Sequence, residues 1–215
     1  RILPSLSPAL TTYPFKTIIN NNSVSLLTSG LSGSGPRGIL FEESAFGVTT
    51  AIIDTITVSN NSIFLSELTS QSQVSIGIGC IYINGYININ GNTIRQLPGT
   101  TSFSGGYIAG ITITSKYGDI FNNTVSNFNL NGSNGVFRGI RTVVAFSEGI
   151  SITGNTVEGI SWENGYSNGS KNIDAISSST STANSNTSTI IVTNNIVRNL
   201  STHKTGTIAG IHEDA

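Results

Sequence analysis

Charged residues are scarce in this 215-residue chain: Asp, Glu, Lys and Arg together make up 10% of it, and the formal net charge is −1. Globular proteins average about a quarter charged residues. The ten Lys and Arg residues are scattered along the sequence without a cluster, so the basic patch that would track nucleic-acid phosphates is missing. We therefore expect no nucleic acid among the partners of this protein.

Other familiar signals are missing as well. Apolar runs are short and no signal peptide opens the chain, so we expect no membrane insertion. The lone cysteine, Cys80, has no internal disulfide partner, and the flanking Ile78 and Ile81 predict a buried thiol. His203 and His212 have no cysteine or acidic partner at metal-ligand spacing, so we expect neither a zinc site nor a cofactor.

Uncharged polar residues take the place of charge. The sequence holds 24 Gly and 24 Asn, with many Ser and Thr, and Ile and Val are spread among them. Such a mixture of turn formers and β-branched residues is typical of many short strands joined by tight corners. We therefore expect an all-β protein.

One pattern repeats six times around an asparagine, and the six anchors are Asn22, Asn61, Asn92, Asn123, Asn155 and Asn195. Successive anchors are 39, 31, 31, 32 and 40 residues apart. Ile or Val stands three residues before and two residues after every anchor, and the residue immediately before it is Asn or Gly. These columns predict strands with one buried face and a left-handed corner between them. Because one such unit cannot bury its own apolar face, the units should stack into a solenoid.

A second strand signal recurs later in each unit, as a small residue followed by Ile. The six pairs are Gly38-Ile39, Gly77-Ile78, Gly110-Ile111, Gly139-Ile140, Ala175-Ile176 and Gly210-Ile211. In the second unit Gly79-Cys80 fits nearly as well, so the register there stays open. Stacking would place the anchor asparagines about 4.8 Å apart, where their amides can form a ladder. The anchors are therefore predicted to be structural residues.

The segments ININGNTI, ISITGNTV and TVSNNSI resemble the repeat of the pectin-lyase-like right-handed parallel β-helix proteins. The resemblance covers residues 15–215 and implies a right-handed parallel β-helix of about six coils, with residues 1–14 as a lead-in or lid segment. It also implies an extracellular or cell-surface location. Because that superfamily includes polysaccharide lyases and hydrolases, phage tailspikes and non-catalytic adhesins, the fold alone does not select an activity.

Aromatic residues between the repeated segments are candidates for ligand binding. Phe103, Tyr107, Trp162 and Tyr166 can stack on sugar rings or fold back onto the core, and both roles stay open. Among them, Trp162 and Tyr166 are the preferred binding candidates.

Catalysis would require acidic residues that converge. The resemblance implies a calcium-binding carboxylate cluster for a lyase, or paired carboxylates on adjacent coils for a hydrolase. Asp54, Asp119 and Asp174 lie at different offsets from their anchors, so no carboxylate column emerges. Arg141 and His212 follow the small-Ile pairs two coils apart, roughly 10 Å. Together with Asp174 they form a candidate catalytic set, and the alternative is ordinary polar residues on an outer strand face.

These observations favour a non-catalytic extracellular or cell-surface module whose loops serve adhesion, glycan binding or assembly. The alternative is a polysaccharide lyase or hydrolase, including the tailspike type, acting in a groove along one sheet; whether the protein is an enzyme stays open. The expected partner is a polysaccharide or cell-surface glycan. Because the sequence lacks Met and stops at AGIHEDA without a capping segment, we also expect a fragment of a longer helix, with adjoining coils or subunits at both open ends.

Overall fold

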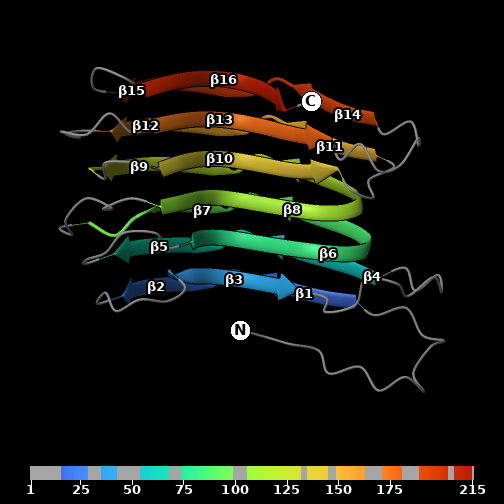
Figure 1. Ribbon diagram of the computed structural model, residues 1–215. Helices are drawn as coiled ribbons and strands as arrows, with labels where there is room; N and C mark the ends of the chain where they lie inside the picture. Colours follow the sequence, from blue (N-terminus) through green and yellow to red (C-terminus); the bar gives the residue numbers. More distant parts are fainter. Residues whose placement is uncertain are drawn as a thin grey trace.

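The computed structural model describes residues 16–28, 35–42, 54–67, 74–98, 106–131, 135–144, 149–162, 171–180, 189–202 and 206–214. These residues wind into stacked coils of short strands, with β1 in the lowest coil and β16 in the highest (Figure 1). Neighbouring strands run parallel in each described pair. The protein is a right-handed parallel β-helix, so the predicted all-β fold is confirmed. Among the described residues there is no helix long and apolar enough to cross a membrane.

Each coil supplies one strand to each of three faces. The first face, before the anchor asparagine, contains β1 (Lys16–Asn20), β4 (Asp54–Ser59), the C-terminal half of β6 (Val74–Asn90), the C-terminal half of β8 (Gly106–Phe121), β11 (Gly149–Thr153) and β14 (Thr189–Thr193). The second face contains β2 (Ser23–Thr28), β5 (Ser62–Glu67), β7 (Thr93–Gln96), β9 (Thr124–Leu130), β12 (Thr156–Trp162) and β15 (Ile196–Thr202). The third face contains β3 (Arg37–Glu42), the N-terminal halves of β6 and β8, β10 (Gly135–Val144), β13 (Lys171–Thr180) and β16 (Gly206–Asp214). Because β6 and β8 pass from the third face into the first, these two faces share one sheet.

The corner between the first and second faces has the backbone conformation that the sequence predicts. The residue before each anchor has a positive φ: 56° at Asn21, 54° at Asn60, 62° at Gly91, 55° at Asn122, 67° at Gly154 and 56° at Asn194. Asn and Gly occupy this left-handed region at the lowest cost, which explains why no other residue stands there.

The anchor asparagines form the predicted ladder. The Oδ1 of Asn92 accepts hydrogen bonds from the backbone N and the Nδ2 of Asn61, both at 2.9 Å. The Nδ2 of Asn92 in turn donates to the Oδ1 of Asn123 at 2.9 Å and to the carbonyl of Val58 at 2.9 Å. The same amide-to-amide bonds link the anchors from Asn22 to Asn195. The anchor asparagines of the four inner coils are at most 1% exposed, and the ladder supplies hydrogen-bond partners for their buried amides.

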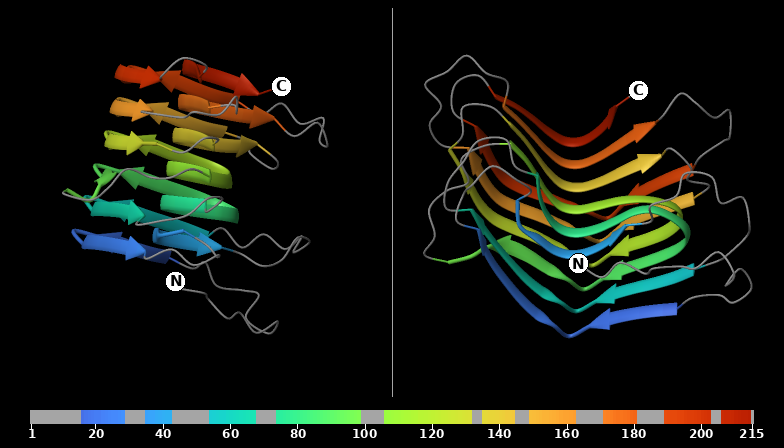
Figure 2. Two further views of the ribbon diagram at one scale, coloured as in Figure 1. Left: turned by 60° about the vertical axis from the view of Figure 1, so that its left-hand side comes forward. Right: turned by 60° about the horizontal axis from the view of Figure 1, so that its bottom comes forward.

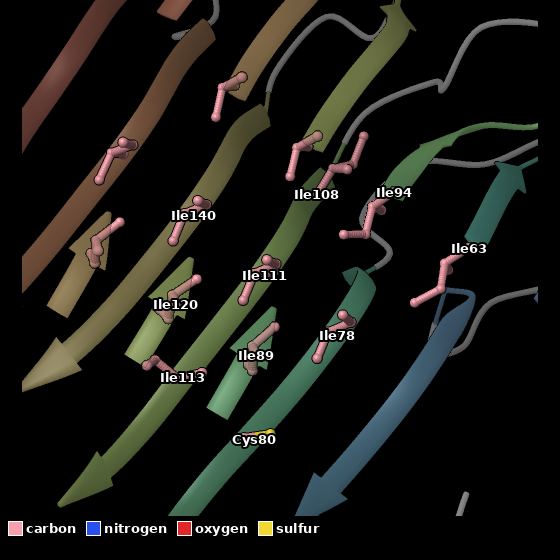
Figure 3. Close-up of a cluster of buried hydrophobic side chains, with 14 of the residues drawn as sticks. Ile63, Ile78, Cys80, Ile89, Ile94, Ile108, Ile111, Ile113, Ile120 and Ile140 are labelled. Atoms are coloured by element: carbon pink, nitrogen blue, oxygen red, sulfur yellow. The ribbon is translucent and has the colours of Figure 1, made fainter. Parts of the chain in front are cut away.

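Isoleucines in equivalent positions fill the interior. Ile78, Ile111 and Ile140 are paired in register on the third face, and their side chains point into the same core (Figure 3). In the second coil, therefore, the pair in register with the other coils is Gly77-Ile78. Cys80, two residues after Ile78, pairs with Ile113. Cys80 is a free, fully buried thiol, and burial raises its pKa to about 12. The buried-thiol prediction is confirmed.

The small-residue column lets the third face bend toward the second. A Cβ at Gly110 would lie 2.6 Å from the carbonyl oxygen of Gly139 and 2.6 Å from both Cγ atoms of Val125. Such distances are well below van der Waals contact, so this position requires glycine. The strands of the third face curve around the bend, and their outer surface is concave (Figure 2).

Candidate functional site

Two rows of side chains point outward from the concave third face. The first row pairs Ala109, Arg138, Asp174 and Ala209 across successive coils, and the second pairs Thr112, Arg141, Ser177 and His212. In the fourth coil, Arg138 and Arg141 directly follow the core residues Phe137 and Ile140, so strand alternation directs both arginines outward. Even so, Asp174 is only 5% exposed and Ser177 only 1% exposed. We call these two rows the concave surface.

Asp174 is the acidic centre of the concave surface. Its Oδ2 accepts a hydrogen bond from the Nε of Arg138 at 3.4 Å, and its Oδ1 lies 3.8 Å from the Nδ1 of His212. The Asp174 side chain is 7% exposed, whereas that of His212 is 44% exposed. The carboxylate is therefore held by the arginine, and His212 contributes a charge–charge attraction only when it is protonated.

Tyr107, one coil below the arginines, contacts both of them. The Nη1 of Arg141 donates to the Tyr107 hydroxyl at 3.3 Å. The guanidinium carbons of Arg138 and Arg141 lie 5.7 and 5.6 Å from the centroid of the Tyr107 ring, within the range of cation–π attraction. The ring therefore supports two cationic groups side by side.

The structure brings part of the predicted catalytic set together. Asp174 and His212 are in contact, while Arg141 lies on the same surface and bonds to Tyr107 instead. The cationic partner of Asp174 is Arg138, which sequence analysis missed. A signal existed: Arg138 directly precedes Gly139 and Asp174 directly precedes Ala175, so both hold the same offset from the small-Ile pair.

The aromatic candidates are placed differently from one another. Tyr107 belongs to β8 and takes part in the concave surface. Trp162 ends β12, is 2% exposed and belongs to the core cluster, so its ring has the packing role of the two roles weighed for it. Phe103 and Tyr166 lie outside the described residues.

Three buried polar atoms in the second row stand without a hydrogen-bond partner in the described part of the chain. They are the Oγ1 of Thr112, the Nε of Arg141 and the Oγ of Ser177, on three successive coils. Buried polar atoms are nearly always paired, so we expect ordered water to bond these three atoms.

The charged groups of the concave surface are two arginines, one aspartate and one histidine. Two arginines and one aspartate give it a surplus of one positive charge when His212 is neutral. Glycoside hydrolysis ordinarily uses two carboxyl groups about 5 to 9.5 Å apart, and the contacts described around Asp174 involve cationic groups. Within the described ranges, no three His, Cys, Asp or Glu side chains are grouped so as to hold a metal ion.

The stacked coils, the three faces and the asparagine ladder define the class of this protein as a right-handed parallel β-helix. Comparisons with protein-family models, with curated proteins and with solved structures find no match for the chain.

Proposed function

We propose that this protein is a non-catalytic, extracellular or cell-surface β-helix module of the pectin-lyase-like kind, and that its concave surface binds an acidic glycan. The observation that carries the proposal is the pair of arginines on this surface: Arg138 is matched by Asp174, whereas Arg141 is partly exposed and bonds to the neutral hydroxyl of Tyr107. The spacing of the six repeats supports the relationship to pectin-lyase-like proteins, and the low charge and high Asn content support the location.

Charge favours an acidic ligand over a neutral one. Asp174 offsets the charge of Arg138, whereas Arg141 is partly exposed and bonds to the Tyr107 hydroxyl. A carboxylate accepts hydrogen bonds from a guanidinium strongly, since the bonds are charge-assisted. Sugar hydroxyls can both donate and accept, which suits a surface lined by polar side chains. A polymer of hexuronic acid offers both groups, a carboxylate and sugar hydroxyls.

The alternative function is cleavage of the same polymer by lyase or hydrolase chemistry. One observation favours it: His212 lies 3.8 Å from Asp174, and a histidine beside a carboxylate can act as a general base. The binding function is preferred because Asp174 is already engaged by Arg138.

Calorimetric titration with an oligomer of hexuronic acid and with a neutral oligomer of the same length tests the proposal. We expect the acidic oligomer alone to bind at the concave surface, more weakly as salt is raised, and Arg141→Ala to weaken it about tenfold. The matched control is Arg198→Ala, because Arg198 is exposed on the second face and pairs with Glu158. Assays for reducing ends and for unsaturated products run alongside. If the protein cleaves the oligomer and Arg141→Ala abolishes that turnover, the protein is an enzyme and the non-catalytic proposal is wrong. If Arg141→Ala and Arg198→Ala bind the acidic oligomer equally well, the concave surface is not the binding site.

A second part of the proposal concerns the sixth coil, whose core columns are open. Ile208 and Ile211 are 44% and 63% exposed, while Ile173 and Ile176, in the same columns one coil below, are 0% and 1% exposed. We propose that an adjoining coil or subunit covers this surface, because further parallel strands would pair its edge and bury these side chains.

A further inference from the structure

A pocket opens on the outer side of the first face, away from the concave surface. It is bounded by β8, β11 and β14 and encloses about 230 Å³. Its walls include Tyr86, Tyr117, Asp119, Gly149, Ile150 and Ile191. Sequence analysis assigned no binding role to these residues.

Two glycines on adjacent strands line this pocket, Gly118 and Gly149. Tyr86, Tyr117, Gly149 and Thr189 occupy one outer column on successive coils, and Gly149 interrupts it. A Cβ built at Gly149 meets no atom within 4 Å, so the space beside it is open. In the column behind, Gly118 stands where the neighbouring coils carry Ile87 and Ile150. Ile150 also lines the pocket, although its side chain is 3% exposed and belongs to the core cluster.

The walls expose apolar surface where an outer strand face is normally polar. Tyr117 is 38% exposed on one side, and Ile191 is 51% exposed on the other. Exposed apolar surface of this kind, gathered around a hollow, is typical of a binding site. The ring and the aliphatic side chain together suit a flat ligand with an apolar face.

Asp119 supplies a hydrogen-bond acceptor at the edge of the pocket. The hydroxyl of Tyr86 donates a hydrogen bond to Asp119 Oδ2. Partial burial, together with the hydrogen bond and negative charge of Asp119, raises the pKa of Tyr86 to about 12. The phenol therefore stays protonated at neutral pH and keeps Asp119 in place, while Asp119 Oδ1 retains its capacity to accept.

We propose that this pocket binds one sugar residue of a neutral glycan, with the ring stacked on Tyr117 and its hydroxyls donating to Asp119. Aromatic stacking and a carboxylate acceptor are the two contacts that a pyranose ring uses best, since it has apolar C–H faces and a polar rim. The volume is below the roughly 300 Å³ at which drug-sized pockets begin, which limits the occupant to a small unit. A cationic ligand is less suited, because the Nζ of Lys116 already lies 5.6 Å from the Tyr117 ring centroid. The site is independent of the concave surface.

NMR of the full chain with labelled isoleucine methyls tests this proposal. The probes are uncharged oligomers of glucose, mannose and xylose at millimolar concentration, with tetramethylammonium as the cationic comparison. We expect at least one neutral oligomer to shift the Ile150 and Ile191 methyl signals. Gly149→Leu should weaken that binding about tenfold, because the leucine side chain would fill the pocket. The fold should be unaffected, because a Cβ at position 149 meets no atom within 4 Å. Tyr117→Ala, as a second variant, should weaken it similarly.

The control is Thr55→Leu, in the same outer column but outside the pocket. We expect it to bind like the unchanged protein, and Arg141→Ala, on the concave surface, to do the same. Loss of neutral-sugar binding in Gly149→Leu but not in Arg141→Ala separates this site from the acidic-glycan site. The proposal is overturned if no neutral oligomer shifts these methyls, if Gly149→Leu binds as well as Thr55→Leu, or if tetramethylammonium is the probe that shifts them.

Discussion

At the scale of single residues, asparagine meets two demands of a buried corner at once. Its amide carries two donors and an acceptor with two lone pairs. In the ladder, the Oδ1 of Asn92 receives two bonds from Asn61, and its Nδ2 serves both the next anchor and the carbonyl of Val58. Stacking identical residues is what makes each amide complementary to the next. An apolar residue in one rung would remove the amide-to-amide bonds to both neighbouring rungs and leave the backbone N–H of the preceding anchor without its acceptor.

We predict that Asn92→Ala lowers the free energy of unfolding by about 3 kcal/mol, since it removes the acceptor of the Asn61 backbone N–H, one bond each from Asn61 Nδ2 and Asn123 Oδ1, and the donor to the buried carbonyl of Val58. Urea denaturation followed by circular dichroism measures the change. The matched control is Asn90→Ala, two residues earlier, where the amide is partly exposed and donates to the side chain of Asn88. That variant should stay within about 0.5 kcal/mol of the unchanged protein. Equal stability of the two variants would contradict a stabilising ladder.

The anchors could be predicted from the sequence because one residue type marks the same position in every coil. The ion pair between Arg138 and Asp174 was missed, because loops of unequal length separate it from the anchors. Arg138 lies 15 residues after Asn123 (138 − 123), whereas Asp174 lies 19 residues after Asn155 (174 − 155). Measured from the anchors the two residues seem unrelated, although they are paired in register on adjacent strands. Where loops of different length intervene, residues that pair across coils must be aligned on a nearer landmark, which here is the small-Ile pair.

At the scale of strands, small residues decide where the coil bends. The column containing Gly110 allows the third face to approach the second, and the concave surface follows from that bend. A further bend was missed: Asn127, Gly159 and Asn199 have φ values of 59°, 65° and 55° inside the second-face strands. The signal was an Asn or Gly four residues after the anchor in the last three coils, and Leu26, Leu65 and Gln96 break it in the first three.

We predict that Gly110→Ala destabilises the protein by about 2 kcal/mol, because its methyl group would overlap the backbone of the next coil and the side chain of Val125. The control is Gly210→Ala in the same column, where the nearest atom to the new Cβ is the Cγ1 of Val197 at 4.0 Å. That substitution should change the stability by less than about 0.5 kcal/mol. Thermal and urea unfolding of both variants provide the comparison. If the two alanines cost the same, close approach of the strands is not the reason for glycine here.

At the scale of the whole molecule, every coil depends on the coils above and below it. In the fourth coil, Ile120 and Val125 are fully buried, and both belong to strands paired on two sides. In the sixth coil, the equivalent Val192 and Val197 are only partly buried. In a stack stabilised by nearest-neighbour contacts, the free energy of local opening should therefore be lowest in the outer coils.

We predict that backbone amides of β14, β15 and β16 exchange with solvent deuterium about a hundredfold faster than those of β8 and β9, since the outer coil opens without unfolding the rest. Hydrogen exchange followed by mass spectrometry measures this, at two protein concentrations. Protection of β16 that rises with concentration toward that of β8 would show that a neighbouring subunit covers Ile208 and Ile211. Protection in the sixth coil that equals that of the fourth at every concentration would mean that the coils open as one unit, and the nearest-neighbour account of their stability would fail.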